Sequence, residues 1–267
     1  MSETVHSRFV LMRDNGNSVL RSFSRTMWLE EGLGACLNAL LVWVALSEPD
    51  IAMACYYAKF SPDHTMCVRS YCQQERSKVN SYDQQKIIDI HNEWRGRVAT
   101  GQIRGLPTAA NMRYIRWDAE LAKIAQAHAN LCRFEHDCRD CRQIDRFKSV
   151  GQNIFTVWLS SRDNHPAIGW RQAIDSWFEE NRRTPLDVIR SFRFGSDFAH
   201  FTQAAWADTE YVGCGYSMYR QNSSYVHLYT CNYGSSGNSW GQPVYQQGQS
   251  CSLCPITTQC NFQGLCV

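Results

Sequence analysis

The sequence has no run of basic residues and no apolar run long enough to cross a membrane. The uncharged apolar stretch 33–46 has 14 residues, whereas a membrane-spanning helix needs about 20. The formal net charge is +2, with 19% charged and 44% hydrophobic residues. Nucleic-acid-binding domains carry clustered Lys and Arg, and disordered chains contain few apolar residues. We therefore expect a globular protein with no stable membrane span and no nucleic-acid partner.

The sequence also lacks the short motifs that mark a hydrolase. It contains no HExxH motif, and no local pattern designates a nucleophilic serine or cysteine. Hydrolysis requires a nucleophile or an activated water, placed next to a base and an oxyanion site. The sequence therefore favours a non-enzymatic function over proteolysis.

Cysteine is abundant, with 13 residues spread from position 36 to position 266. This number is typical of proteins in oxidising compartments. The run 33–46 follows Arg21 and Arg25 and precedes small residues that suit cleavage after Ser47 or Ala54. We expect residues 1–54 to be a leader with a signal peptide, and the protein to be secreted. A short type II membrane anchor is the alternative. Removing Cys36 with the leader would leave twelve cysteines.

Hydrophobic periodicity divides the rest of the chain into three parts. Residues 55–82 contain turn residues and cysteines but little periodicity, and are expected to form an extended arm. The main domain spans 83–233. Within it, apolar residues at helical spacing predict helices over 83–100, 118–132, 167–182 and 196–205.

Strands are expected at 151–158, 211–219 and 225–233, where apolar and aromatic residues alternate or lie close together. The alternation of helices and strands is too irregular for a doubly wound fold. We predict an α+β fold, with helices packed on a small antiparallel sheet.

Residues 234–267 are rich in Gly, Ser and Gln and carry four cysteines in the last 16 positions. Such a segment is too short to form a hydrophobic core, so we expect a small disulfide knot on a flexible neck. A zinc knuckle is the alternative for this cysteine spacing.

Five segments together resemble the CAP superfamily, which comprises cysteine-rich secretory proteins, antigen five and pathogenesis-related proteins. They are HTMC at 64–67, HNEWR at 91–95, GQNI at 151–154, HFTQ at 200–203 followed by Trp206, and CNY at 231–233 followed by Gly237 and Asn238. The resemblance is strongest to the antigen-five-like venom and salivary proteins of arthropods. It departs from the pattern at Ala199, where glycine is usual, and at Gln152, where many relatives have glutamate.

The resemblance implies an α-β-α sandwich with a disulfide-stapled N-terminal arm, a cysteine-rich tail and a central cleft. The cleft residues carried over by position are His136, Gln152, Glu180 and His200. Two imidazoles and a carboxylate can bind a divalent cation such as zinc. Because Gln152 is an amide, this site is expected to be a polar, hydrogen-bonded cleft that holds at most a weakly bound cation, and no cofactor is required. The HNEWR segment, including His91, is expected to be a packing motif.

The resemblance and the cysteine positions also imply a disulfide pattern. The expected pairs are Cys55–Cys67, Cys72–Cys132, Cys138–Cys141, Cys214–Cys231, Cys251–Cys260 and Cys254–Cys266.

The functional hypothesis is a secreted, non-enzymatic protein that binds a small apolar ligand, such as a lipid, or an extracellular protein. The alternative is a metal-dependent hydrolase or protease that uses Glu180 as base and His136 and His200 as ligands. The sequon at Asn222, in a predicted hairpin turn, is a candidate glycosylation site.

Overall fold

The computed structural model describes residues 11–14, 17–20, 55–162 and 166–267. The chain divides into two compact units, residues 1–53 and 54–267. In the first, β1 (Leu11–Asp14) and β2 (Asn17–Leu20) pair as an antiparallel hairpin. The expected signal peptide at 33–46 and its cleavage positions lie outside the described residues. Among the helices that the structure describes, none is both long and apolar enough to cross a bilayer.

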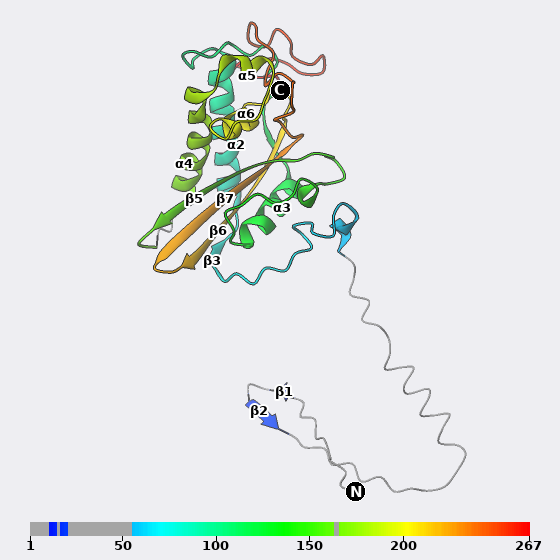
Figure 1. Cartoon of the computed structure of the whole chain (residues 1–267), viewed down its shortest axis with the longest axis vertical. Helices are drawn as coiled ribbons and strands as arrows, with labels where there is room; N and C mark the ends of the chain where they lie inside the picture. Colours follow the sequence, from blue (N-terminus) through cyan, green and yellow to red (C-terminus); the bar gives the residue numbers. More distant parts are fainter. Residues whose placement is uncertain (1–10, 15–16, 21–54, 163–165) are drawn as a thin grey trace, which may run out of the picture. The chain divides into compact units, whose positions relative to one another are not determined.

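The second unit is built on one sheet with the strand order β3-β6-β7-β5 (Figure 1). These strands are β3 (Gln74–Ser77), β6 (Tyr211–Gln221), β7 (Ser224–Gly234) and β5 (Gly151–Leu159), and all neighbours are antiparallel. The short strand β4 (Arg116–Trp117) joins β6 in parallel. The antiparallel sheet is confirmed. Strand β3 was not expected, because the polar sequence QERS has no apolar alternation.

Helices cover both faces of the sheet. On one face, α3 (Ala119–Asn130) approaches β6 so closely that a side chain at Gly215 would lie 2.3 Å from the backbone of Gln126. On the other face, Trp170 of α4 (Pro166–Glu179) packs edge-on against Tyr229 of β7. Alternate residues of a strand point to opposite faces, so the strands are buried on both sides. The expected α-β-α sandwich is confirmed.

The remaining helices lie close to the second face. They are α2 (Ser81–Ala99), η3 (Glu180–Arg183), α5 (Leu186–Arg190) and α6 (Ala199–Ala204). Two 3₁₀ turns, η1 (Tyr56–Lys59) and η2 (Asp140–Arg142), lie elsewhere in this unit. Helix α2 begins with a capping box, in which Asn80 and Asp83 bond each other's backbone N–H. The helix expected at 167–182 ends in the 3₁₀ turn η3, and the one expected at 196–205 is three residues shorter at its start.

Arg95 connects α2 to the segment that follows α6. Its guanidinium is fully buried and donates to five backbone carbonyls, those of Arg113, Ala204, Trp206, Ala207 and Thr209. A buried charge is tolerated only when its donors are satisfied. Arg95 therefore fixes the C-terminal end of α6, which places His200 of the same helix relative to the sheet.

Within residues 55–267, the described part of this unit contains six disulfides, and each is one of the pairs that the resemblance implied. Cys55–Cys67 closes the arm, and Cys72–Cys132 ties the arm to the residue that follows the C-cap of α3. Cys214–Cys231 links the neighbouring strands β6 and β7.

The expectation of a flexible neck before the tail is wrong. Val244, Tyr245 and Leu265 are each at most 1% exposed and belong to the main hydrophobic core. The tail also bonds the domain through its backbone, for example from Cys266 N–H to the carbonyl of Met112. The tail is therefore part of the packed domain, and burial of its few apolar side chains holds it there.

Candidate functional site

A cleft of about 390 Å³ lies at the end of the sheet where β5 begins and β7 ends. Its walls come from the loop after α3, the start of β5, helix α6 and the segment after β7. The lining residues are His136, Arg139, Arg142, Ser149, Val150, Gly151, Gln152, Asn153, Phe194, Ser196, Ala199, His200, Gln203, Ser236, Gly237 and Asn238. Three of the four predicted site residues therefore line one cleft. The fourth, Glu180, lies behind it.

His136 is oriented by Gln152. The Nδ1 of His136 lies 2.8 Å from Oε1 of Gln152, whose Nε2 donates to Oδ1 of Asn232. Because Gln152 presents its oxygen to the ring, Nδ1 of His136 carries the proton and Nε2 keeps its lone pair. Burial lowers the pKa of His136 below its ordinary value, and the charges of Arg142 and His200 add to this effect. His136 is therefore neutral at pH 7.

His200 is oriented by Glu180, the first residue of the 3₁₀ turn η3. Oε1 of Glu180 lies 2.7 Å from Nδ1 of His200, and Oε2 accepts from the backbone N–H groups of His200 and Phe201. Both carboxylate oxygens thus hold His200 and the start of α6. Glu180 is 9% exposed and is a positioning residue rather than a group that faces the cleft.

These contacts define what a metal ion would meet. Each imidazole is held through Nδ1, and within the described part of the chain no hydrogen bond to Nε2 of either ring is found. Two imidazole nitrogens suit a divalent transition metal, but zinc sites in proteins usually supply three or four protein ligands. Nε2 of His136 and Nε2 of His200 are the two nitrogen atoms that stay open to such a cation. Glu180 and Gln152 would act on it through the two rings.

Gln203 places an unused donor at the cleft. Its side chain is 3% exposed and its Oε1 accepts from Gly237 N–H, while Nε2 has no partner among the described residues. A side chain at Gly151 would lie 2.0 Å from Oε1 of Gln203, so any larger residue there would displace this amide. This N–H group is buried in the wall of the cleft, so an acceptor in the cleft reaches it only after the side chain of Gln203 moves.

The outer part of the cleft is aromatic and cationic. Phe194 and Trp240 are 68% and 76% exposed and line an adjoining hollow, with Arg139 between the two cavities. Arg142 is paired with Asp137 at 2.6 Å. Sequence reasoning missed Arg139, Phe194 and Trp240, because they lie in loops without periodicity or motif.

His91 is a core residue, as its motif implied. Its Nδ1 lies 2.8 Å from the carbonyl of Ile87 and its Nε2 3.0 Å from the hydroxyl of Tyr233, and it is fully buried. Burial lowers the pKa of His91 to about 4. Both ring nitrogens are satisfied in the neutral form, so His91 is not available as a ligand.

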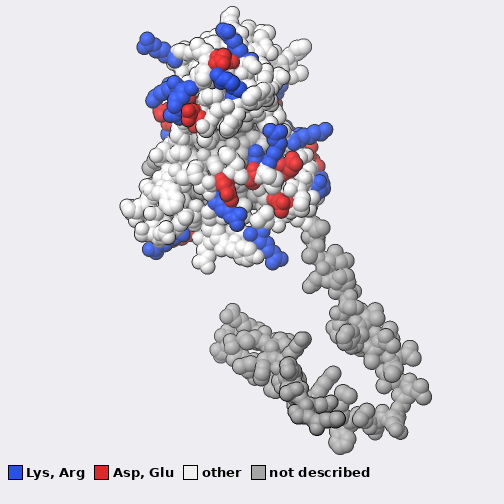
Figure 2. Space-filling view, viewed as in Figure 1, with Lys and Arg blue, Asp and Glu red and all other residues white. Residues whose placement is uncertain are grey.

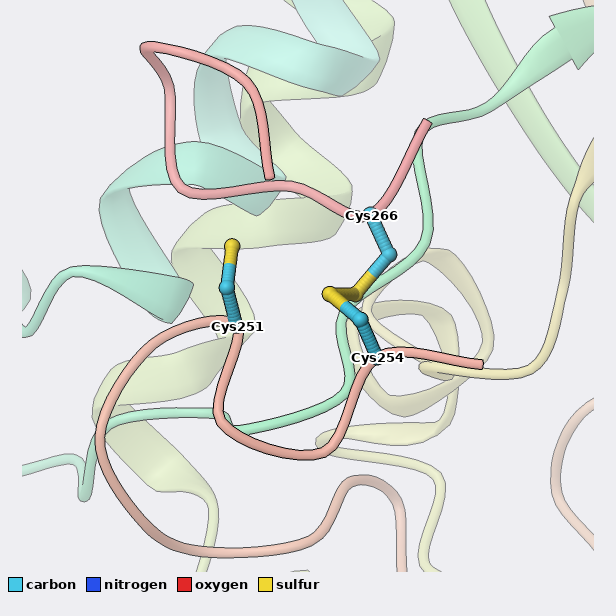
Figure 3. Close-up of side chains that lie close together, drawn as sticks. All are labelled: Cys251, Cys254 and Cys266. Atoms are coloured by element: carbon cyan, nitrogen blue, oxygen red, sulfur yellow. A yellow bond between two sulfur atoms is a disulfide. The ribbon is translucent and has the colours of Figure 1, made fainter. Parts of the chain in front are cut away.

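The tail brings three sulfur atoms together. The Sγ atoms of Cys251, Cys254 and Cys266 lie within 4.8 Å of one another (Figure 3). Cys254 is bonded to Cys266, and Cys251 is bonded to Cys260. Zinc requires thiolates, so these disulfides argue against the zinc-knuckle alternative.

The outer surface carries both positive and negative side chains, and it exposes the glycosylation sequon. On the face shown in Figure 2, positive and negative side chains lie next to one another. Asn222 is exposed, in the turn between β6 and β7, with a φ of 56° that asparagine tolerates. Glycosylation there stays a prediction.

Comparison with solved structures supports the fold. A crystal structure of NaASP2 with Zn²⁺ matches with a TM-score of 0.58 and 28% identity, covering 73% of this chain and 100% of that one. The structure of BmVAL-1 matches with a TM-score of 0.59 at 24% identity, covering 73% and 98%, and shows the fold alone.

Comparison with known sequences gives the family. A cysteine-rich venom protein of Tityus serrulatus is 42% identical over 240 residues, covering 86% of this chain and 58% of that protein. Scoloptoxin SSD976 of Scolopendra dehaani is 34% identical, covering 73% and 89%. The chain spans between 50% and 59% of three of the curated relatives that it matches. The model of the cysteine-rich secretory protein family, CAP, matches residues 88–233, and the chain therefore belongs to the CAP family.

Proposed function

We propose that this chain is a secreted CAP protein that holds a small ligand in its cleft without chemical turnover. The ligand has an apolar body and a head group that accepts hydrogen bonds. The single observation that carries this proposal is the cleft of about 390 Å³, which opens beside the exposed rings of Phe194 and Trp240. The unpartnered Nε2 of Gln203 lies buried in its wall and would donate to a ligand oxygen after the side chain moves toward the cleft.

The rim suits the apolar part of such a ligand. Phe194 and Trp240 present large exposed aromatic surfaces beside the cleft, and burying them against a ligand would be favourable. Arg139 lines both cavities and supplies a positive charge between the aromatic rim and the two imidazoles. An acidic lipid, such as a fatty acid, has these features.

The two side chains behind the imidazoles are already engaged. A general base must reach the proton that it removes. Glu180 uses both oxygens to hold His200 and α6, and Gln152 is an amide that cannot accept a proton at neutral pH. These contacts argue against Glu180 as the base that the hydrolase alternative assigns to it, while Nε2 of both imidazoles stays open.

A weakly bound divalent cation is also proposed, with Nε2 of His136 and of His200 as its protein ligands. The relative NaASP2 has been crystallised with Zn²⁺. Such an ion would add positive charge to the cleft and would favour a ligand with an acidic head group.

Native mass spectrometry of the secreted protein tests the proposal, since it detects copurifying small molecules and metals together. Palmitate binding is then measured for Phe194→Ala and Gln203→Leu, with Trp158→Ala as the control. Trp158 is also an exposed aromatic residue, but it lies near the other end of β5. We expect the two cleft variants to bind at least about tenfold more weakly and the control to bind normally.

Equal binding by all three variants, with no copurifying small molecule, would reject the cleft as a ligand site. The zinc-loaded protein is also assayed with peptide and ester substrates. Turnover that disappears in His200→Ala would instead establish the hydrolase. An extracellular protein target stays the alternative partner, and pull-down from extracellular fluid tests it.

A further inference from the structure

We propose that Cys138–Cys141 is a site of reversible thiol–disulfide exchange that takes a low-molecular-weight thiol as its reactant. The two cysteines are three positions apart in the sequence CRDC, with Cα atoms 4.9 Å apart. Cys138 is exposed, whereas Cys141 is 5% exposed. The disulfide therefore presents the sulfur of Cys138 and shields that of Cys141. A thiol would accordingly attack one particular sulfur, that of Cys138.

A hollow of about 290 Å³ lies beside this disulfide and shares His136 with the wall of the cleft. Both cysteines line it, together with Asp63, Thr65 and Arg133. Three acids, Asp63, Glu135 and Asp137, line the hollow with Arg133, so it suits a small thiol that carries a positive amino group.

The buried sulfur has a hydrogen-bond partner that suits a leaving group. Oγ of Ser61, in the N-terminal arm, lies 3.9 Å from Sγ of Cys141. The same oxygen accepts from the backbone N–H of Asp63, so the hydroxyl proton of Ser61 is free to point at the sulfur. A donor at this position stabilises negative charge on Cys141 when the disulfide opens.

The local backbone does not depend on the disulfide. Cys141 N–H donates to the carbonyl of Cys138, and Cys141 accepts through its own carbonyl from Thr65 N–H. Arg142 donates to the carbonyls of Asp137, Cys138 and Val150. These bonds hold the loop in place when the sulfurs separate, so Cys141 stays close enough to re-form the bond.

The other disulfides are less suited to reversible exchange. They close between 9 and 60 residues, so opening them releases longer segments of chain. Both sulfurs of Cys214–Cys231 are buried between strands. Cys251–Cys260 is the closest competitor, because Cys260 is exposed, and it serves as the internal comparison.

The exchange proceeds in two balanced steps. The thiolate of the reactant attacks Sγ of Cys138, the bond to Cys141 breaks, and its electron pair leaves with Cys141, which takes a proton from water. A second thiolate then attacks the reactant's sulfur in this mixed disulfide, and Cys138 leaves as a thiolate. Two reactant thiols lose two electrons and form one disulfide, while the protein disulfide gains them. The reverse sequence restores the protein.

The first experiment exposes the whole folded protein to graded ratios of reduced to oxidised glutathione. Free thiols are trapped with N-ethylmaleimide and located by peptide mapping, and circular dichroism is recorded at each ratio. We expect Cys138 and Cys141 to be alkylated at glutathione ratios at least about tenfold less reducing than Cys251 and Cys260, with no change in the spectrum. Opening of Cys251–Cys260 first, or at the same ratio, overturns the proposal.

Single substitutions test the direction of attack. Cys141→Ser leaves the exposed thiol, and we expect it to form a mixed disulfide with oxidised glutathione at least about tenfold faster than Cys138→Ser. Equal rates overturn the assignment of Cys138 as the attacked sulfur. Ser61→Ala is expected to slow opening severalfold, and Ser61→Thr to restore it. An unchanged rate in Ser61→Ala overturns the role of the hydroxyl.

Discussion

Replacing Gln152 with glutamate should strengthen cation binding in the cleft. In the present structure Gln152 offers only a neutral oxygen to Nδ1 of His136, at 2.8 Å. The Gln152→Glu variant offers a carboxylate to the same nitrogen. The amide Nδ2 of Asn232 has no partner among the described residues, although its Oδ1 accepts from Gln152. After rotation, this amide would donate to the new carboxylate and offset part of the cost of burying it.

The size of the effect follows from the geometry. A cation about 2 Å from Nε2 of His136 lies roughly 7 Å from the carboxylate across the ring. The doubly charged cation and the carboxylate attract each other at this distance by about 1.2 kcal/mol in bulk water, where the dielectric constant is about 80. At a dielectric constant of about 40 the attraction is about 2.4 kcal/mol. Affinity should therefore rise about tenfold to fiftyfold, which agrees with the usual effect of groups that orient metal ligands.

Calorimetric titration of the secreted chain with Zn²⁺ at pH 7.5 measures this change. Gln152→Leu is the uncharged control and should bind more weakly than the wild type, because the ring loses its acceptor. Ser160→Glu adds the same charge just beyond the other end of β5 and should have little effect, since salt screens charges at that separation.

Two results would refute the reasoning. One is a dissociation constant for Gln152→Glu within twofold of the value for Ser160→Glu. The other is unchanged affinity in His136→Ala and His200→Ala, which would place the ion elsewhere in the protein. Binding should also weaken as the pH falls below about 6, because protons compete for the imidazole nitrogens.

Three further predictions concern stability and pairing. The buried His91 has a pKa of about 4 against 6.5 when unfolded, so its contribution is complete above pH 6.5 and is lost as the pH falls to 4. This loss is about 3 kcal/mol, and urea unfolding at each pH should show it in the wild type but not in His91→Gln. Arg95→Met should lower the free energy of unfolding by about 3 to 5 kcal/mol. A loss below 1 kcal/mol in chemical denaturation would mean that its five carbonyls find other donors. Cys260→Ala frees Cys251 within 4.8 Å of the Cys254–Cys266 sulfurs, and peptide mapping should find Cys251 newly bonded to one of them. Retention of the original pair alone would contradict this.

The elements with strong periodicity were predicted from the sequence, and the weakly patterned ones were not. Strands β5, β6 and β7 and helices α2 and α3 carry regular apolar residues, so their positions follow from side-chain burial. Strand β3 is polar and bonds to β6 at the edge of the sheet, where only the backbone is needed. The tail was misread because its few buried side chains, including Val244 and Leu265, have no regular spacing.

The motifs located the cleft residues but did not assign their roles. Sequence reasoning placed His136, Gln152, Glu180 and His200 in one site and treated Glu180 as a ligand or base. The structure instead uses Glu180 to hold His200 and the start of α6. The hydrogen bonds that a side-chain atom makes depend on contacts between distant segments, such as Glu180 and His200, which are 20 residues apart. No local sequence pattern encodes those contacts. The same reason explains why the donor of Gln203 was not recognised.

The two ends of the central hairpin serve separate purposes. Strand β7 runs for 11 residues from the turn that contains Asn222 to the edge of the cleft, a length of roughly 35 Å. A glycan, a biotin or an anchoring group attached at the turn would therefore lie far from the cleft. The protein can be fixed to a surface through Asn222 while its cleft stays open to the solution, which gives a defined orientation for any binding assay.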